Sequence, residues 1–224
     1  MTSDESWSTT LREITDIERP DHSYLGVEHI CAYFGEYTAR KGWAHSRANG
    51  IINNLKKPPS KRGTGEWYYK EKAISDIGRA IRSNLRPEAL ADITIIPAPP
   101  SKQPDDPEYD DRMYQVAKAI GNGVDVRPML RCRQSRQAAH LSDVRPGPDA
   151  LAENIELIEQ AMGSLPPRST VLVLDDVLVT GATFVACSRI LRARFPEISV
   201  LGLFVARRVP ERDLDFDAFE VWDG

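Results

Sequence analysis

Residues 171–183 read Val-Leu-Val-Leu-Asp-Asp-Val-Leu-Val-Thr-Gly-Ala-Thr, and they are the most informative segment of the chain. Four branched apolar residues, 171–174, indicate a strand that is buried on both faces, as in a parallel sheet. The carboxylates Asp175 and Asp176 come at its end. After a short turn, apolar residues recur at a helical spacing over 184–191. We therefore predict a strand, a turn and a helix of an α/β fold.

The turn at 179–183 has the composition of an anion-binding site. Its glycine allows a ligand to approach the backbone closely, and the free N–H groups and the dipole of the following helix favour negative charge. The simpler alternative is an ordinary turn whose threonines cap the helix. We expect the turn to bind substrate through Val179, Thr180, Gly181, Ala182 and Thr183.

The acidic pair before the turn suits a different part of a ligand. Asp175 and Asp176 repel phosphate, but carboxylates accept hydrogen bonds from the vicinal hydroxyls of a sugar, or hold a hydrated Mg²⁺. A phosphate at the turn and a diol at the acids together describe a ribose 5-phosphate. In the alternative interpretation, the two acids are merely solvated.

An apolar strand, two acids, three variable residues and Thr-Gly-small-Thr follow one another in this segment. It resembles the phosphoribosyl-pyrophosphate (PRPP) loop of the type I phosphoribosyltransferases. The resemblance implies an α/β fold in which a Rossmann-like parallel sheet is flanked by helices and carries a small N-terminal hood subdomain. Bacterial receiver domains also carry an acidic pair, but they lack the Thr-Gly-Ala-Thr turn.

The bulk composition is typical of a globular protein. The 224 residues suffice for one large domain or for a core with an appended subdomain, and 41% apolar residues can fill a core. The net charge of −4 disfavours nucleic acid, although local basic patches leave that partner open. No apolar run reaches membrane-spanning length, and the start is polar and acidic, so we expect a cytoplasmic protein without membrane contact. Three isolated cysteines fit a reducing compartment.

The chain divides into an N-terminal arm with a hood-like subdomain, residues 1–66, and a phosphoribosyltransferase-like core, residues 67–224. Residues 1–20 are polar and weakly periodic, which suits a frayed arm or a surface helix. Residues 21–66 are aromatic and basic, and their aromatic residues favour a small local core over a base-stacking platform. Their basic run is either a solvated loop or a contact to pyrophosphate or nucleic acid. It consists of Lys56, Lys57, Lys61 and Arg62.

Apolar periodicity predicts the remaining elements of the core. A helix starts near Trp67 and is limited by Pro87. Strands that alternate with helices imply a parallel sheet with right-handed crossovers. Further helices are expected over 110–120 and 151–162, and further strands over 93–96, 124–130, 200–206 and 216–222.

Two other loops are candidates to bind phosphate groups. The first follows the strand at 93–96, where open α/β sheets place ligands, and it offers Ser101 and Lys102. In the resembled superfamily this loop binds the pyrophosphate; otherwise it is a proline-stiffened connector. The second loop is rich in arginine, which suits a flap that closes over phosphate charge, or a solvated loop. Its residues are Arg131, Arg133 and Arg136, followed by Gln137, His140 and Arg145.

The layout is most similar to the ComF-like branch of the superfamily. The likeness lies in the Ile-Pro-Ala-Pro strand end, in the arginine-rich loop before Asn154 and in the final motif. ComF-like proteins often begin with paired zinc-binding cysteines, whereas only Cys31 lies in that region, so we predict no zinc site. Hypoxanthine–guanine transferases carry an Asp near the purine where this chain has Val179. Because valine cannot exchange a proton, salvage of 6-oxopurines is not expected.

The resemblance implies a pentosyltransferase that binds PRPP or another nucleotide 5-phosphate, with Mg²⁺ as cofactor. Asp175 and Asp176 would be the catalytic pair that orients the ribose hydroxyls, directly or through Mg²⁺, while the turn anchors the 5-phosphate. A nitrogenous acceptor would displace pyrophosphate, and Glu36, His45 and His140 are weak candidates for its general base. The alternative is a ComF-like nucleotide sensor or interaction module linked to DNA processing, regulation or defence; a nucleotide-consuming toxin is a third. Homodimers are common among the resembled proteins, which leaves a homodimer open.

Overall fold

Six strands form one sheet within the residues that the computed structural model describes, which are 6–136, 146–163 and 165–210. All neighbouring strands are parallel except the first two, which are antiparallel. The expected α/β fold with a mostly parallel sheet is therefore confirmed. The spatial order is β1 (Trp7–Glu13), β2 (Cys31–Thr38), β8 (Ser199–Val209), β7 (Thr170–Leu178), β3 (Ile93–Pro97) and β4 (Asp125–Val126).

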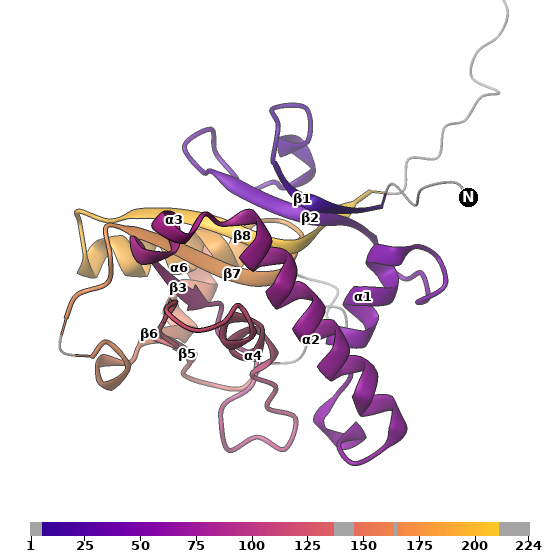
Figure 1. Ribbon diagram of the computed structural model, residues 1–224. Helices are drawn as coiled ribbons and strands as arrows, with labels where there is room; N and C mark the ends of the chain where they lie inside the picture. The colour runs from indigo at the N-terminus through magenta and orange to yellow at the C-terminus, as the bar shows by residue number, and fades with distance from the viewer. Residues whose placement is uncertain (1–5, 137–145, 164, 211–224) are drawn as a thin grey trace, which may run out of the picture.

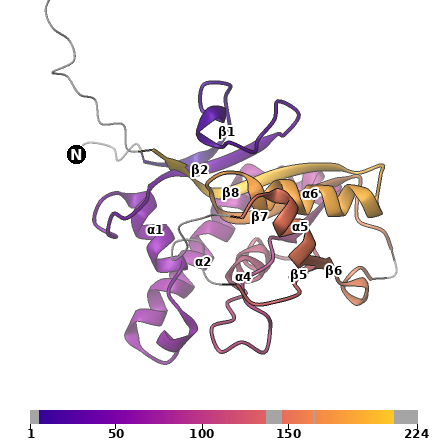
Figure 2. The ribbon, with the colours of Figure 1, turned by 180° about the vertical axis from the view of Figure 1, so that it is seen from behind.

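Helices cover both faces of the sheet, so the molecule has three layers (Figures 1 and 2). One face carries α1 (Arg47–Leu55), α2 (Gly65–Asn84), α3 (Pro87–Ala91) and α4 (Arg112–Ala119). The other carries α5 (Pro148–Asn154), α6 (Ala182–Arg194) and an antiparallel ribbon of β5 (Leu130–Cys132) and β6 (Ile155–Leu157). Single turns of 3-10 helix are η1 (Arg19–Asp21), η2 (Pro59–Lys61) and η3 (Glu159–Ala161).

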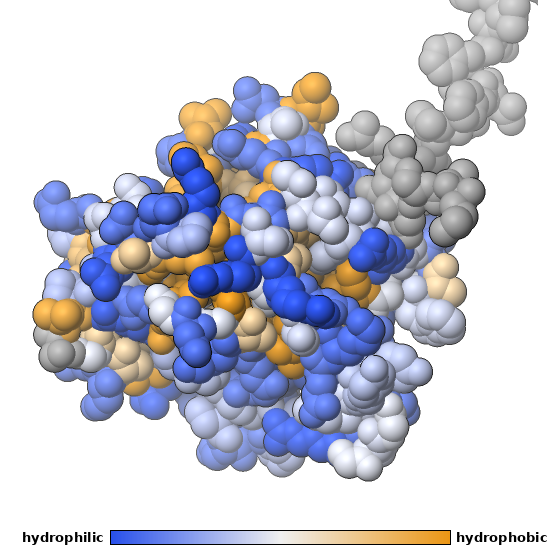
Figure 3. Space-filling model, viewed as in Figure 1, coloured by the Kyte–Doolittle hydropathy of each residue, from blue (hydrophilic) through white to orange (hydrophobic). Residues whose placement is uncertain are grey.

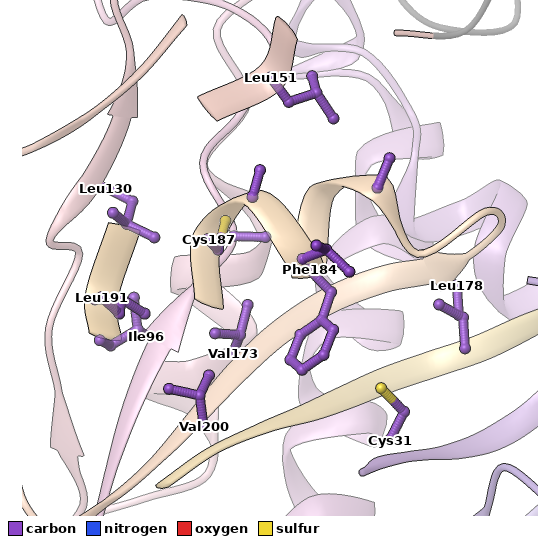
Figure 4. Close-up of a cluster of buried hydrophobic side chains, with 14 of the residues drawn as sticks. Cys31, Ile96, Leu130, Leu151, Val173, Leu178, Phe184, Cys187, Leu191 and Val200 are labelled. Carbon is purple, nitrogen blue, oxygen red and sulfur yellow. The ribbon is translucent and has the colours of Figure 1, made fainter. Parts of the chain in front are cut away.

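Each face of the sheet has its own hydrophobic core, because successive strand residues point to opposite sides. Along β7, Val173 packs toward α6, whereas Leu174 packs toward α2 and α4. Figure 4 shows the first of these cores, in which Phe184 and Leu191 of α6 gather with Val173. The thiol of Cys187 lies in the same core, buried and free. Burial on both faces explains why the sequence of β7 is continuously apolar.

Several elements lie where the apolar periodicity predicts them. The helix expected from Trp67 is α2, which buries Ile74, Ile77 and Ile81 and ends shortly before Pro87. The predicted helix over 110–120 is α4. The predicted strands over 93–96 and 200–206 are β3 and β8.

The N-terminal residues differ from the prediction. Instead of a frayed arm or a surface helix, β1 is an edge strand, whose Trp7 ring stacks on Phe34 with centroids 5.7 Å apart. An edge strand leaves one side to water, so its polar sequence hides the pairing. β2 belongs to the main sheet, and Phe34 shares a core with Leu55 of α1 and Leu174 of β7. Much of the segment 1–66 is therefore integral to the sheet and its core.

The prediction of one helix over 151–162 is wrong. α5 ends at Asn154, and Ile155 begins β6, which pairs with Cys132 of β5. The Asn154 side chain fixes this junction, because its Oδ1 accepts the Gln134 N–H at 3.0 Å and its Nδ2 donates to the Gln134 carbonyl at 3.1 Å. Tertiary pairing thus overrides an apolar spacing that suits more than one structure.

The strand predicted over 124–130 is divided between β4 and β5. Pro128 lies between them and has no N–H to donate to a ladder, which explains the interruption. The edge strand predicted over 216–222 lies outside the described residues, as do Gln137, His140 and Arg145.

The surface is largely hydrophilic on the face shown in Figure 3. Apolar atoms stand out at the top of this view, over the connection between β1 and β2, where Ile17 and Val27 are 82% and 83% exposed. Scattered apolar side chains of this kind are normal on folded chains. Across the described ranges, no helix combines the length and apolar character needed to cross a lipid bilayer.

Candidate functional site

The acidic pair lies at the edge of the sheet where the parallel strands end, called the carboxyl edge below. β3 pairs with β7 only as far as Leu174, so β7 continues beyond its neighbour with Asp175 and Asp176. The two carboxylates point to opposite faces: Asp176 contacts Arg112 of α4, and Asp175 interacts electrostatically with Cys187 of α6. Open α/β sheets bind their ligands at such an edge.

Asp176 is held by two cations from outside the motif. Its Oδ2 accepts hydrogen bonds from Arg112 Nε at 3.0 Å and Nη2 at 2.6 Å, and its Oδ1 lies 3.2 Å from Lys56 Nζ. Burial opposes its ionisation, yet Lys56 and Arg112 hold the pKa of Asp176 below its ordinary value. A carboxylate has about four lone-pair sites. With these contacts in place, little of its acceptor capacity is left for a sugar.

Asp175 has the opposite character. Burial, together with the charge of Asp176, raises the pKa of Asp175 to about 7. Its Oδ1 accepts the backbone N–H of Asp176 at 2.8 Å. Near neutral pH this carboxyl therefore exists in both protonation states, and it can donate or accept a hydrogen bond.

A chain of ion pairs runs from Asp176 into the α2–α4 interface. Asp110 Oδ2 accepts hydrogen bonds from Arg112 Nη1 at 2.9 Å and from Lys70 Nζ at 2.6 Å. Lys70 is fully buried and also donates to the carbonyl of Lys57 at 2.7 Å. Burial lowers the pKa of Lys70, while its bond to Asp110 acts in the opposite direction. We call Lys56, Lys70, Asp110, Arg112 and Asp176 the charge network.

The predicted anion-binding turn joins β7 to α6. Gly181 adopts the left-handed conformation, with φ 83° and ψ −4°, and α6 begins at the next residue. Thr180 Oγ1 accepts the Ala182 N–H at 3.4 Å, which is a long bond. Thr183 lies in the first turn of α6, where backbone N–H groups have no partner within the helix. The turn thus combines hydroxyls with the positive end of a helix dipole.

The connection between β1 and β2 forms hydrogen bonds to the backbone of this turn. His22 Nδ1 donates to the carbonyl of Val179 at 2.6 Å, and the Tyr24 N–H donates to the carbonyl of Thr180 at 2.9 Å. Burial lowers the pKa of His22, and its buried Nε2 has no hydrogen-bond partner among the described residues. Val179 also packs its side chain against the α2-face core. The backbone of the turn is therefore positioned by residues that sequence reasoning did not identify.

Gly181 is required by both its conformation and its surroundings. A Cβ at this position would lie 2.7 Å from Leu25 Cδ2, and an L-residue in the left-handed region costs about 1–2 kcal/mol. We therefore expect Gly181→Ala to lower the free energy of unfolding by about 1–2 kcal/mol in urea titrations. The control is Gly65→Ala at the start of α2, where a Cβ has open space, and which should not lower stability. Equal stability of both variants would contradict the described turn.

The other predicted phosphate-binding residues are engaged with protein groups. Lys102 Nζ lies 3.5 Å from Asp106 and 3.6 Å from Glu108. Ser101 accepts the Arg136 N–H through its carbonyl at 2.7 Å, which brings the two predicted loops together. The remaining contacts are Arg131 to Glu156 at 2.5 Å, Arg133 to Glu156 at 3.3 Å and Arg136 to Cys132 Sγ at 3.6 Å.

Two surface hollows lie near the candidate site, but neither is lined by Asp175 or Asp176. One hollow of about 330 Å³ lies at the connection between β1 and β2 and is lined in part by Arg19, His22 and Leu25. Another of about 260 Å³ lies between the loop after β3 and the β5–β6 ribbon, beside Arg131 and Glu156. Each is too open to enclose a ligand, so they border the carboxyl edge without defining its site.

The residues present do not form a cage for a resident Mg²⁺. Asp175 and Asp176 point to opposite faces, and Asp176 is neutralised by Arg112 and Lys56. Over the described ranges, no three His, Cys, Asp or Glu side chains gather in a way that could hold a metal ion. Of the weak general-base candidates, Glu36 is paired with Arg207 at 2.9 Å.

The partners of Asp176 are the residues that the motif did not reveal. In the sequence, Lys56 belongs to a basic run and Arg112 to a predicted helix. Neither carries a local signal, since each meets Asp176 through the tertiary fold.

A scan of the chain against protein-family models finds no match. A search of curated proteins likewise finds no similar sequence. The resemblance of residues 171–183 to the PRPP loop therefore stands as a proposal, to be judged on the site itself.

Proposed function

We propose that this protein binds PRPP, or another ribose 5-phosphate ligand, at the carboxyl edge of a type I phosphoribosyltransferase fold. It transfers the phosphoribosyl group to a nitrogenous acceptor and releases pyrophosphate. In this proposal, residues from the N-terminal segment 1–66 serve as the hood. The observation that carries the proposal is the placement of two acids of opposite protonation character beside a glycine-initiated helix, at the end of a buried parallel strand.

Each part of the ligand then has a chemically suitable partner. The hydroxyls of Thr180 and Thr183 and the first N–H groups of α6 bind the 5-phosphate. Asp175 donates to or accepts from one ribose hydroxyl, and Asp176 accepts from the other through Oδ1, the oxygen that Arg112 does not contact. Anchoring the phosphate holds the anomeric carbon in place, which lowers the entropic part of the barrier. Any Mg²⁺ would be supplied by the pyrophosphate of the ligand rather than by a site of the protein, as is common where a protein offers few carboxylates.

Calorimetric titration with PRPP, with and without Mg²⁺, tests the proposal directly. NMR of phosphorus in a mixture of nucleobases then shows whether pyrophosphate is released. We expect Thr183→Val, which removes one hydroxyl at nearly constant shape, to weaken PRPP binding by about tenfold. The control is Thr170→Val at the opposite end of β7, which should bind as the wild type does. Wild-type protein that binds neither PRPP nor ribose 5-phosphate would refute the proposal.

One observation favours a second candidate, a ComF-like nucleotide sensor or interaction module without turnover. The cations expected to grip a leaving pyrophosphate are paired with carboxylates, Lys102 with Asp106 and both Arg131 and Arg133 with Glu156. A site of this kind binds a nucleotide without assisting departure of a leaving group. PRPP binding with no pyrophosphate released would favour this second function.

A further inference from the structure

Lys56 differs from the other cations of the charge network in its freedom to move. Arg112 is fixed by hydrogen bonds to two acids, one to Asp110 and two to Asp176. Lys70 is fully buried between Asp110 and the carbonyl of Lys57. Lys56, in contrast, makes a single ion pair within the described part of the chain, to Asp176 at 3.2 Å, and its side chain is 38% exposed. A lysine ammonium on its four-carbon stem can move to another anion without disturbing the fold.

The local charge balance leaves room for an anionic ligand. Among the described residues, the charge network contains Lys56, Lys70 and Arg112 against the carboxylates of Asp110 and Asp176. One positive charge is therefore in excess, beside an Asp175 that is partly protonated near neutral pH. The excess charge lies at the carboxyl edge, next to the turn that starts α6.

The contact between Lys56 and Asp176 limits the hydrogen bonds that Asp176 can accept from a sugar. Arg112 occupies Oδ2 with two hydrogen bonds, so Oδ1, the atom that Lys56 contacts, is the oxygen left for a ribose hydroxyl. Departure of Lys56 would free this oxygen, and Arg112 would keep the carboxylate oriented and compensated.

We propose that Lys56 exchanges partners when the ligand binds: its ammonium leaves Asp176 for the pyrophosphate of PRPP, and Asp176 Oδ1 then accepts a ribose hydroxyl. This inference rests on the proposed function and adds a residue that the loop motif does not contain. Lysine is a common phosphate-binding residue and acts as a point charge, which suits a group that must move.

The test compares Lys56→Gln with Lys61→Gln in titrations with PRPP, ribose 5-phosphate and inorganic pyrophosphate. Lys61 is a matched control because its side chain is 42% exposed and pairs with one acid, Glu66. We expect Lys56→Gln to lower the affinity for PRPP and for pyrophosphate by about tenfold. Its affinity for ribose 5-phosphate should be unchanged or higher, since Asp176 is released.

The outcomes separate this inference from the proposed function. If Lys56→Gln binds PRPP as tightly as the wild type, Lys56 does not contact the ligand and the inference fails while the function stands. An equal loss of PRPP affinity in Lys61→Gln would show a long-range charge effect and would also overturn the inference. Wild-type protein that binds neither PRPP nor ribose 5-phosphate would refute the function, and the inference with it.

Discussion

Replacement of Arg112 by methionine is expected to destabilise the protein by about 3 kcal/mol, because it removes three charge-assisted hydrogen bonds from two nearly buried carboxylates. Arg112 donates to Asp176 and to Asp110, whose carboxylates are only 10% exposed. Lys56 and Lys70 would remain, but each makes a single contact to its acid. Urea denaturation at pH 7 measures the change in the free energy of unfolding.

The control for this experiment is Arg79→Met on α2. Arg79 also pairs with an acid, Asp76, but its side chain is 72% exposed, so its loss should change stability by less than about 0.5 kcal/mol. The double variant Arg112→Met/Asp176→Asn should recover part of the loss, since an asparagine does not require the charge compensation that Arg112 gives to Asp176. If Arg112→Met is as stable as Arg79→Met, the charge network does not support the fold. Asp176→Asn alone also disturbs this network, so Asp175→Asn is the cleaner probe of the acidic pair.

Asp175→Asn is expected to stabilise the protein by about 4 kcal/mol at pH 8 and to change its stability little at pH 4. The folded pKa of Asp175, about 7, lies above its ordinary value of 3.8. The folded state therefore binds the proton more tightly, and stability contributed by this group is lost as the pH rises toward 7. Above pH 7 the wild type holds a second, half-buried anion beside Asp176. Asparagine carries no charge and can still accept the Asp176 N–H.

Thermal and urea unfolding at pH 4 and pH 8 measure this effect, provided that both proteins are compared in the same buffers. The control is Asp149→Asn, whose carboxyl is 89% exposed, so the stability difference from wild type should be small at both pH values. A destabilised Asp175→Asn variant at pH 8 would show that the Asp175 carboxylate has a stabilising partner, contrary to the arrangement described.

The sequence alone determined the elements whose patterns are local. Residues 171–183 specify a strand buried on both faces, a glycine turn and a helix, because a run of branched apolar residues, a left-handed glycine and a helical spacing each act within a few residues. α2 and α4 could be predicted for the same reason. The helix predicted over 151–162 failed where local spacing was compatible with two structures, and pairing of Ile155 with Cys132 decided between them.

Only the tertiary structure decided how the two acids differ. Asp175 and Asp176 are identical and adjacent in sequence, yet they point to opposite faces of the sheet. Arg112 is 64 residues away from Asp176 in the chain, and Lys56 belongs to a segment expected to lie in another subdomain. Ion pairs and burial depend on distances between elements, and no local pattern encodes those distances. The motif therefore identifies the carboxyl edge, whereas the packing of α1 and α4 sets the charge of each acid on it.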